Sequence, residues 1–383
     1  MSFDAEAAVV GGGVVGCAVA HALSSTGVAT VLLERNTALA TEASGANSGI
    51  VHTGFDSPPG ELETELILRS AVLRTALLPK LGIVLERCGA LLRGGPSQVA
   101  TVERLAANAH ANGVAVEARG PGELFVPGES ITDPVAFTEA LADRARARGA
   151  DVRLGAPVAA LGRGESGGVR VELASGERLL VRGVANCAGL YADELAASAG
   201  PAPFEVYPRK GEFLVFEQPA EPLREILLPL PSAAGKGVLV FPTIDGHVIA
   251  GPTARDRADK GDWRVEPDAG ELILEKARRM FAALEGAEPI AAYAGLRPAG
   301  RGANYAIAPS TVLPALVNVG AIRSTGLTAA LGIGELVARL LGGVAGLRLR
   351  ETPRETALPA RTPAPPWWQL AAERSRRAEE EGA

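Results

Sequence analysis

The first thirty-five residues constrain the fold of this chain more than any other stretch, because they predict one strand–turn–helix–strand unit. The apolar run at 7–10 is typical of a buried parallel strand. Gly11, Gly13 and Gly16 follow it and occupy the three glycine positions of a GxGxxG motif. An apolar helix and a second apolar strand at 28–33 complete the unit. We therefore expect an α/β fold built on a parallel sheet.

Each glycine of the motif has a mechanical role in binding a dinucleotide. Gly11 makes the tight turn, Gly13 lets a pyrophosphate approach the backbone, and Gly16 lets the helix pack closely on the strand. The helix N-terminus then points its amides at the phosphates. The second strand delivers Glu34, whose carboxylate can accept hydrogen bonds from ribose hydroxyls and would repel a 2′-phosphate. The alternative is a glycine-rich turn in an ordinary α/β protein.

Composition limits the classes of partner. The chain has 383 residues, 47% hydrophobic and 21% charged, which is typical of a globular protein with a large core. A net charge of −6 gives no footprint for nucleic acid, so basic residues that converge on a site would indicate a small anionic ligand. We expect no transmembrane segment, because no apolar run reaches the required length. The three cysteines are scattered and give no metal ligand set, which favours a reduced, cytoplasmic setting.

The rest of the chain separates into segments of different character. Residues 36–60 are rich in small polar residues, and so long a loop in a compact domain is usually functional. Residues around Ser175-Gly176 alternate apolar and polar, which predicts a hairpin. The remaining expected helices are at 61–80, 97–111, 133–149, 276–284 and 326–341, and the remaining expected strands at 88–92, 152–154, 183–189, 212–216, 238–241, 247–250 and 316–320. The tail consists of a proline-rich linker at 352–366 and a charged helix at 367–380.

Five segments of the chain resemble the D-amino-acid-oxidase-type FAD oxidoreductases, and the resemblance covers residues 7 to about 345. Within that superfamily, two of the segments are most similar to glycerol-3-phosphate dehydrogenases and L-2-hydroxyglutarate dehydrogenases; these are 44–54 and 320–328. The five segments are the N-terminal unit ending in Glu34-Arg35, Ser44–Gly54, Asn186–Gly189, Tyr293–Pro298 and Gly320–Thr328.

The resemblance implies a two-part architecture. A Rossmann-type FAD-binding domain would be assembled from 1–80, 150–200 and 296–345. An antiparallel substrate-binding sheet, an α+β insert, would be formed by 81–149 and 201–295. Residues 346–383 would form the linker and the short C-terminal helix, which Trp367 and Trp368 would dock onto the domain.

The resemblance also implies the cofactor and its contacts. We expect FAD, bound non-covalently, because no cysteine lies in the C-terminal half and His52 has a competing catalytic role. The amides at the start of the last long helix would stabilise negative charge at N1 and O2 of a reduced flavin. The expected cofactor-binding residues are Gly11, Gly13, Val14, Val15, Gly16, Glu34, Arg35, Ser44, Asn47, Ser48, Val158, Ala188, Gly189, Gly326, Leu327 and Thr328.

Four side chains are candidates for substrate chemistry, and each has a structural alternative. Arg297 would clamp a carboxylate or phosphate, or else it is a surface arginine at a strand end. Arg323 would join it, or else it forms a structural ion pair. His52, as a neutral imidazole, would take a hydroxyl proton, or else it is a structural histidine or the site of a covalent flavin link. Lys210 is a third cation of the site or a solvated strand residue.

We therefore expect an FAD-dependent enzyme that oxidises a small anionic secondary alcohol, either a polyol phosphate such as glycerol 3-phosphate or a 2-hydroxy acid. The sequence does not name the electron acceptor, which could be oxygen, a quinone or a carrier protein. The alternatives are an amine or amino-acid oxidase of the same superfamily and a flavoprotein subunit without catalysis. Asn304 stands where this branch usually has an acid, which leaves the substrate open.

Overall fold

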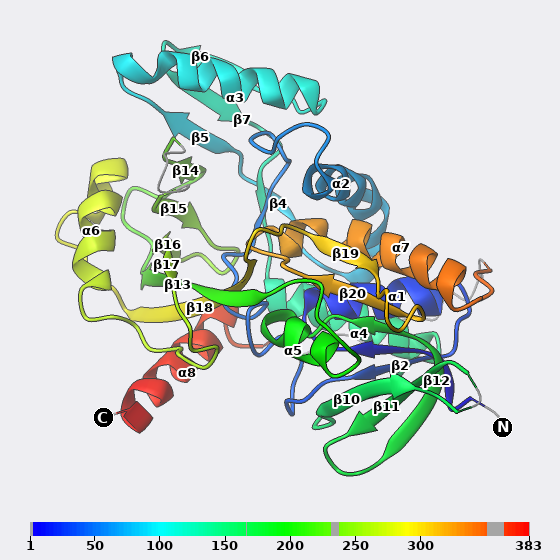
Figure 1. Ribbon diagram of the computed structural model, residues 1–383. Coiled ribbons are helices and arrows are strands. Elements are labelled where there is room, and N and C mark those ends of the chain that lie inside the picture. Colours follow the sequence, from blue (N-terminus) through cyan, green and yellow to red (C-terminus); the bar gives the residue numbers. More distant parts are fainter. Residues whose placement is uncertain (1–2, 166, 231–236, 351–363, 383) are drawn as a thin grey trace.

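The computed structural model describes residues 3–165, 167–230, 237–350 and 364–382. Two large sheets dominate it (Figure 1), and the structure also contains a small three-stranded sheet. The predicted linker at 352–366 falls mostly outside the described residues. The helices are α1 (Val14–Ser25), α2 (Leu62–Leu81), α3 (Val99–Ala111), α4 (Pro134–Ala147), α5 (Ala192–Ala197), α6 (Ala269–Met280), α7 (Gly326–Val344) and α8 (Trp367–Gly382).

The first sheet has eight strands and contains the predicted N-terminal unit. Its path is β10-β11-β12-β1-β2-β9, and β20 pairs with both β12 and β19. β1 runs parallel to β2 and to β12, so the buried parallel sheet expected from the sequence is present. The strands are β1 (Ala5–Val10), β2 (Thr30–Leu33), β9 (Asp151–Arg153), β10 (Val158–Arg163), β11 (Val169–Leu173), β12 (Arg178–Asn186), β19 (Ala306–Pro309) and β20 (Leu316–Gly320).

Strand β1 is apolar throughout its buried part because it contributes to a core on each face of the sheet. Ala7 and Val9 pack with α1, α4 and α7, whereas Ala8 and Val10 pack with the side chains of β10 and β11. Successive side chains of a strand point to opposite faces, so a strand covered on both sides loses its polar positions. This packing explains the apolar run that opens the sequence.

The second sheet has nine strands and is mostly antiparallel, as expected for the insert. Its longest pairing joins β13 to β18 in ten register pairs, from Val206 opposite Gly300 to Val215 opposite Ala291. The strands are β5 (Ala90–Arg93), β6 (Glu117–Gly120), β7 (Glu123–Val126), β13 (Val206–Phe216), β14 (Ile226–Leu228), β15 (Leu239–Pro242), β16 (Val248–Gly251), β17 (Arg255–Asp256) and β18 (Ala291–Gly300). The small third sheet consists of β3 (Ile50–Val51), β4 (Glu86–Arg87) and β8 (Ser130–Ile131).

Two elements cross the expected domain boundaries, and helix α6 is displaced from its expected position. Strand β18 crosses the expected boundary at 296, because all of it pairs with β13. Helix α4, expected in the substrate part, packs on α1 beside the first sheet. Helix α6 starts at Ala269, seven residues or about two turns before the expected Lys276, and ends at Met280 instead of Leu284.

Helix α7 is long and apolar enough, by length and composition, to cross a membrane. However, 61% of its most apolar window is buried inside the protein, where it packs against α1 and α2. Its hydrophobicity is therefore accounted for by its place in the core.

Helix α8 docks on the second sheet, as Trp367 and Trp368 predicted. Both indoles are buried, and the helix packs against β18 and α4. The hydroxyl of Ser375 accepts a hydrogen bond from the Ala294 N–H of β18 at 3.0 Å.

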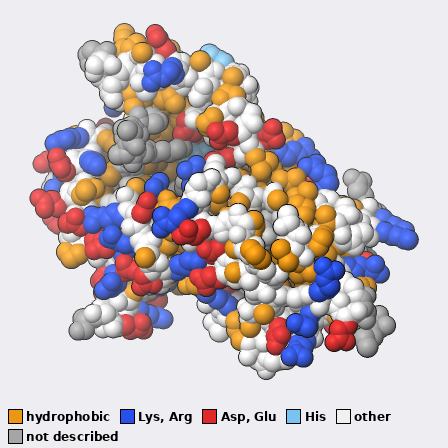
Figure 2. All heavy atoms as spheres, viewed as in Figure 1, with side chains coloured by type: hydrophobic (Ala, Val, Ile, Leu, Met, Phe, Trp, Pro, Cys, Tyr) orange, Lys and Arg blue, Asp and Glu red, His pale blue; other side chains and the backbone are white. Residues whose placement is uncertain are grey.

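In the face shown in Figure 2, acidic and basic side chains alternate around α6 and β17, whereas hydrophobic ones gather over β19 and β20.

Candidate active site

One cavity of about 1010 Å³ collects almost all of the predicted site residues. It starts at the carboxyl ends of β1 and β2, where Val10 and Leu33 line it, and extends to β13 and β18 of the second sheet. Ligands of doubly wound sheets bind at this end of the strands. The predicted residues that line it are Gly11, Gly13, Val14, Val15, Glu34, Arg35, Ser44, Asn47, Ser48, His52, Val158, Ala188, Gly189, Arg297, Arg323, Gly326 and Leu327.

The glycine motif is packed too tightly for any side chain. Gly11 has φ +108°, and a Cβ there would lie 2.4 Å from the carbonyl oxygen of Cys187. A Cβ on Gly16 would lie 1.9 Å from the Gly11 carbonyl oxygen, so Gly16 lets helix and strand approach and does not itself line the cavity. Gly13 is the N-cap of α1 and offers no side-chain oxygen to its amides. The Ser44 hydroxyl accepts the N–H of Val14, the first helical residue, at 2.9 Å, so the amides that follow Val14 are the ones that can point at a phosphate of a dinucleotide.

Glu34 is held in place at the ribose end of the cavity. One carboxylate oxygen accepts the Gly12 N–H at 2.6 Å and the other accepts the Asn36 N–H at 2.7 Å. Burial raises the pKa of Glu34, and these two hydrogen bonds act in the opposite direction. Since each carboxylate oxygen has more than one lone pair, the group can still accept from ribose hydroxyls.

The part of the cavity where the flavin ring is expected is lined by the start of a helix. Gly326 and Leu327 open α7, whose N-cap Thr325 makes no side-chain cap. Ser44 lines the same cavity, although its hydroxyl already accepts the Val14 N–H at 2.9 Å. Thr328 does not line the cavity: its hydroxyl accepts the backbone N–H of His52 at 3.1 Å. A helix N-terminus at this place can stabilise a developing negative charge.

His52 has a buried carboxylate partner that sequence reasoning missed. The Nδ1 atom of His52 lies 2.8 Å from Glu129 Oε2, and the Glu129 side chain is fully buried. The other oxygen of Glu129 accepts both the N–H and the hydroxyl of Thr53, at 2.7 and 2.8 Å. With an ionised Glu129, Nδ1 carries the proton and Nε2 is an acceptor. His52 itself lines the cavity.

Arg297 also lines the cavity and is not a surface residue. Its Nε donates to the Arg209 carbonyl at 3.1 Å, and its Nη2 donates to the carbonyls of Lys210 and Thr253 at 3.1 and 2.9 Å. Burial, together with the positive charges of Arg209 and Arg323, lowers the pKa of Arg297 to about 10. Among the described residues, no carboxylate forms a hydrogen bond with this guanidinium. Its charge is therefore available to an anion.

Arg323 lies on the same cavity but is more exposed. Its Nη2 is 3.4 Å from Glu63 Oε2, and its side chain is 44% exposed. Glu63, from α2, also accepts the Thr325 hydroxyl at 2.5 Å and the Asn304 side-chain amide at 2.6 Å. Position 304 itself has no carboxylate, but Glu63 of helix α2 places one directly beside it.

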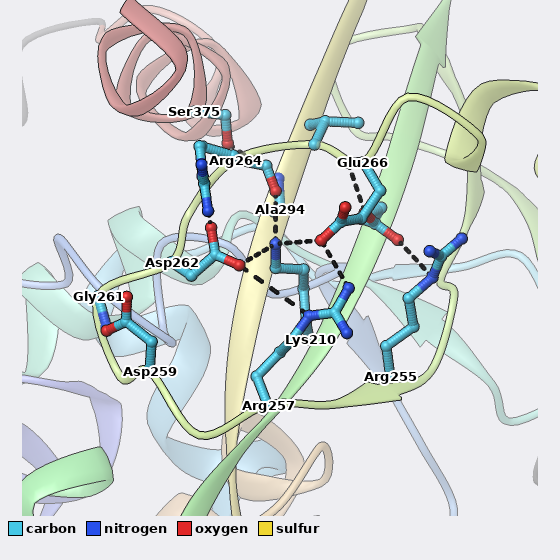
Figure 3. A network of polar contacts seen from close by, with 12 residues as sticks. Lys210, Arg255, Arg257, Asp259, Gly261, Asp262, Arg264, Glu266, Ala294 and Ser375 are labelled. Atoms are coloured by element: carbon cyan, nitrogen blue, oxygen red, sulfur yellow. Dashed lines mark hydrogen bonds and ion pairs between the residues drawn. The ribbon is translucent and has the colours of Figure 1, made fainter. Parts of the chain in front are cut away.

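The prediction that Lys210 is a site cation, and its alternative as a solvated residue, are both wrong. Lys210 is fully buried and absent from the cavity wall. Its ammonium contacts Asp262 at 2.7 Å, the Arg264 carbonyl at 2.8 Å and Glu266 at 3.2 Å, as Figure 3 shows. In β13 the neighbours Arg209 and Gly211 face the cavity instead, because side chains alternate along a strand.

Glu129 and Glu63 carried no local signal in the sequence. Each lies far along the chain from its partner, 77 residues in the pair with His52 and 260 in the pair with Arg323. Burial of a lone acidic residue is decided only by the tertiary fold.

Within the described residues, no group of three or more His, Cys, Asp or Glu side chains could hold a metal ion.

The parallel sheet, the glycine turn and the cavity at the strand ends define a dinucleotide-binding protein, and comparison with known proteins gives its family. The chain belongs to the FAD dependent oxidoreductase (DAO) family, whose model matches residues 6–340. It is thus an FAD-dependent oxidoreductase, as the resemblance implied.

Three relatives place it more closely. It is 28% identical to a glycerol 3-phosphate dehydrogenase of Caloramator mitchellensis over 358 residues, which is 89% of this chain and 74% of the relative. It is 30% identical to an L-2-hydroxyglutarate dehydrogenase of Escherichia coli over 272 residues, which is 64% of this chain and 63% of the relative. The structure of an FAD-bound L-alpha-glycerophosphate oxidase of Mycoplasma pneumoniae superposes with a TM-score of 0.84 at 27% identity, covering 91% of this chain and 97% of that one.

Proposed function

We propose that this oxidoreductase removes a hydride from a small anionic secondary alcohol, either a polyol phosphate of the glycerol 3-phosphate type or a 2-hydroxy acid. The observation that carries the proposal is that one cavity is lined both by His52, whose Nδ1 meets the buried Glu129 carboxylate, and by Arg297, whose guanidinium is held by backbone carbonyls. An alcohol needs a base for its proton, and an anion needs a fixed positive charge. The named activities of the relatives support the same substrate classes.

His52 is the base in this proposal. Because Glu129 receives the Nδ1–H, the lone pair of Nε2 is left to accept the substrate hydroxyl proton. The imidazolium that results is stabilised by the Glu129 carboxylate, which Thr53 already holds in place through two hydrogen bonds. Bound FAD would supply the hydride acceptor, at N5 of its isoalloxazine ring.

Arg297 holds the substrate anion, with Arg323 as the outer cation. The backbone carbonyls that fix the guanidinium of Arg297 accept from Nε and Nη2. Among the described residues Nη1 has no hydrogen-bond partner, so a phosphate or carboxylate can accept from it. Arg323 is half exposed and shared with Glu63, so we assign it steering of the anion and a smaller part of the affinity.

FAD is bound without a covalent link in this proposal, since His52 is committed to Glu129 and to proton transfer. Acid precipitation of the purified protein should therefore leave the yellow colour in the supernatant. Colour that stays in the pellet would contradict this part of the proposal and would make His52 the first candidate for the link.

The substrate class is tested by bleaching of the flavin in the absence of oxygen. The panel contains glycerol 3-phosphate, other polyol phosphates, 2-hydroxy acids, N-methyl amino acids and glycerol as an uncharged control. We expect bleaching by one of the anionic alcohols. Bleaching by amines alone would favour the amine-oxidase alternative, and a flavin that no substrate bleaches would favour the non-catalytic one. Reoxidation with oxygen, a quinone or a dye then ranks the acceptors.

A further inference from the structure

Strand β13 carries two sets of side chains that face opposite sides of the β13–β18 ribbon. Arg209, Gly211 and Phe213 line the cavity. Lys210 and Glu212 alternate with them and are fully buried on the other side. Two ionisable side chains without any exposed surface are costly to bury unless they are bonded throughout, so their retention in this strand requires a physical reason.

The guanidinium of Arg297 lies across β13, where it is held by three backbone carbonyls. Two belong to β13 itself, at Arg209 and Lys210, and the third belongs to Thr253, which follows β16. The guanidinium can lie there only because Gly211 has no side chain: a Cβ on Gly211 would be 2.8 Å from Arg297 Nη2. The position of these carbonyls therefore sets the direction of the Arg297 fork.

The residues that offer two of these carbonyls are anchored by their side chains on the reverse side. Lys210 is anchored by Asp262 and Glu266 (Figure 3). The hydroxyl of Thr253 donates to Glu212, and the Glu212 N–H donates back to that hydroxyl at 3.0 Å. Glu212 also accepts the Glu266 N–H at 2.8 Å, which joins the two anchors into one network.

The acidic side chains of this network and their neighbours are each paired with a cation. Asp262 pairs with Lys210 and Arg264, and Glu266 pairs with Lys210 and Arg257. Two further pairs join Asp256 to Arg209 at 2.6 Å and Glu212 to Arg255 at 3.6 Å. Each of these acids is therefore committed to a cation other than Arg297.

We propose that Glu212 and Lys210 are positioning residues for Arg297. From the side of the ribbon that faces away from the cavity, they fix the carbonyls that aim the guanidinium. This inference rests on the proposed function, because it takes Arg297 as the group that binds the substrate anion. Neither residue touches the cavity, so both act only through Arg297.

The test is a double-mutant cycle on the purified FAD-containing enzyme, with Glu212→Gln and Arg297→Lys. The dissociation constant of inorganic phosphate is measured from the change in flavin absorbance, and kcat and KM with the alcohol that bleaches the flavin best. Glu212→Gln should weaken phosphate binding and raise KM about five- to thirtyfold, with kcat changed less than about threefold. In the Arg297→Lys background the same change should have less than about a twofold effect.

The controls separate this inference from the proposed function. Glu335→Gln removes a surface carboxylate paired with Arg69 and should change neither constant. If Arg297→Lys alone leaves both phosphate affinity and KM unchanged, the proposed anion site fails. If it weakens them but Glu212→Gln does not, or does so equally in both backgrounds, only the positioning inference fails. Thr253→Val, which removes the hydroxyl but keeps the carbonyl, serves as a second variant with the same expected result, and it decides the matter if Glu212→Gln loses FAD.

Discussion

Two parts of the cavity wall, called its two sides below, handle charge in opposite ways. On one side, His52 is paired with a fully buried carboxylate, Glu129, at 2.8 Å. On the other side, Arg297 is held by neutral carbonyls, and Asp256, the acid that acts on its charge, is paired with Arg209. A group that gains a proton needs a negative partner to stabilise the charge it acquires, whereas a group that binds an anion must keep its own charge unpaired. The difference indicates proton transfer on one side and anion binding on the other.

The sharpest way to separate the two sides is to remove the base. His52→Asn should lower the rate of flavin reduction by about a hundredfold or more, because the hydroxyl proton has no acceptor. Stopped-flow spectroscopy without oxygen measures the rate, and the affinity for inorganic phosphate should change little. His247→Asn is the matched control, since His247 also lies 2.7 Å from a carboxylate, Asp245, but does not line the cavity. A rate unchanged in His52→Asn would remove the acid–base side of the comparison.

Removing the planar guanidinium of Arg297 should weaken binding of the substrate anion. Arg297→Lys keeps the charge but loses the planar donors. The resulting drop in kcat/KM should correspond to a loss of about 1.5–3 kcal/mol in transition-state binding. Because the pKa of Arg297 is lowered to about 10, the wild-type affinity for phosphate should also weaken as the pH rises through 10, where the cation is lost. Arg301→Lys, in a surface pair with Glu205, is the control. Oxidation of uncharged polyols at a rate that Arg297→Lys leaves unchanged would count against an anion clamp.

Glu129→Gln tests whether the carboxylate sets the tautomer of His52. The two Thr53 donors should hold the oxygen of the new amide, so its NH₂ group would face Nδ1 and donate to it. The proton of the imidazole then moves to Nε2, and flavin reduction should slow about ten- to fiftyfold while phosphate still binds. If Glu129→Gln weakened phosphate binding as much as the rate, the two sides would not be independent.

Arg323→Gln should have the smallest effect. Its side chain is 44% exposed and shared with Glu63, so screening by water limits its contribution to anion binding to about 1 kcal/mol or less. KM measured at low and high salt checks this, because the effect should shrink at high salt. An effect as large as that of Arg297→Lys would show that the anion rests on both arginines equally.

The sequence by itself determined the parts of this protein that rest on contiguous residues. The apolar run, the glycine turn and Glu34 lie within thirty-five residues, and their backbone geometry requires these residue types locally. The family was likewise recognised from contiguous segments, and two adjacent indoles, Trp367 and Trp368, marked the helix that docks at the C-terminus. The Gly11 and Gly16 packing distances show the physical reason, since no side chain fits at either position.

The tertiary structure alone decided which charges act together. Glu129 meets His52, and Glu63 meets Arg323, across separations of 77 and 260 residues that no local pattern encodes. The strand register decided the rest: Lys210 was expected at the site, but its side chain points to the opposite side of β13 from Arg209 and Gly211. A one-residue difference along a strand reverses the face of a side chain, so the sequence could give the strand but not the side on which each of its charges lies.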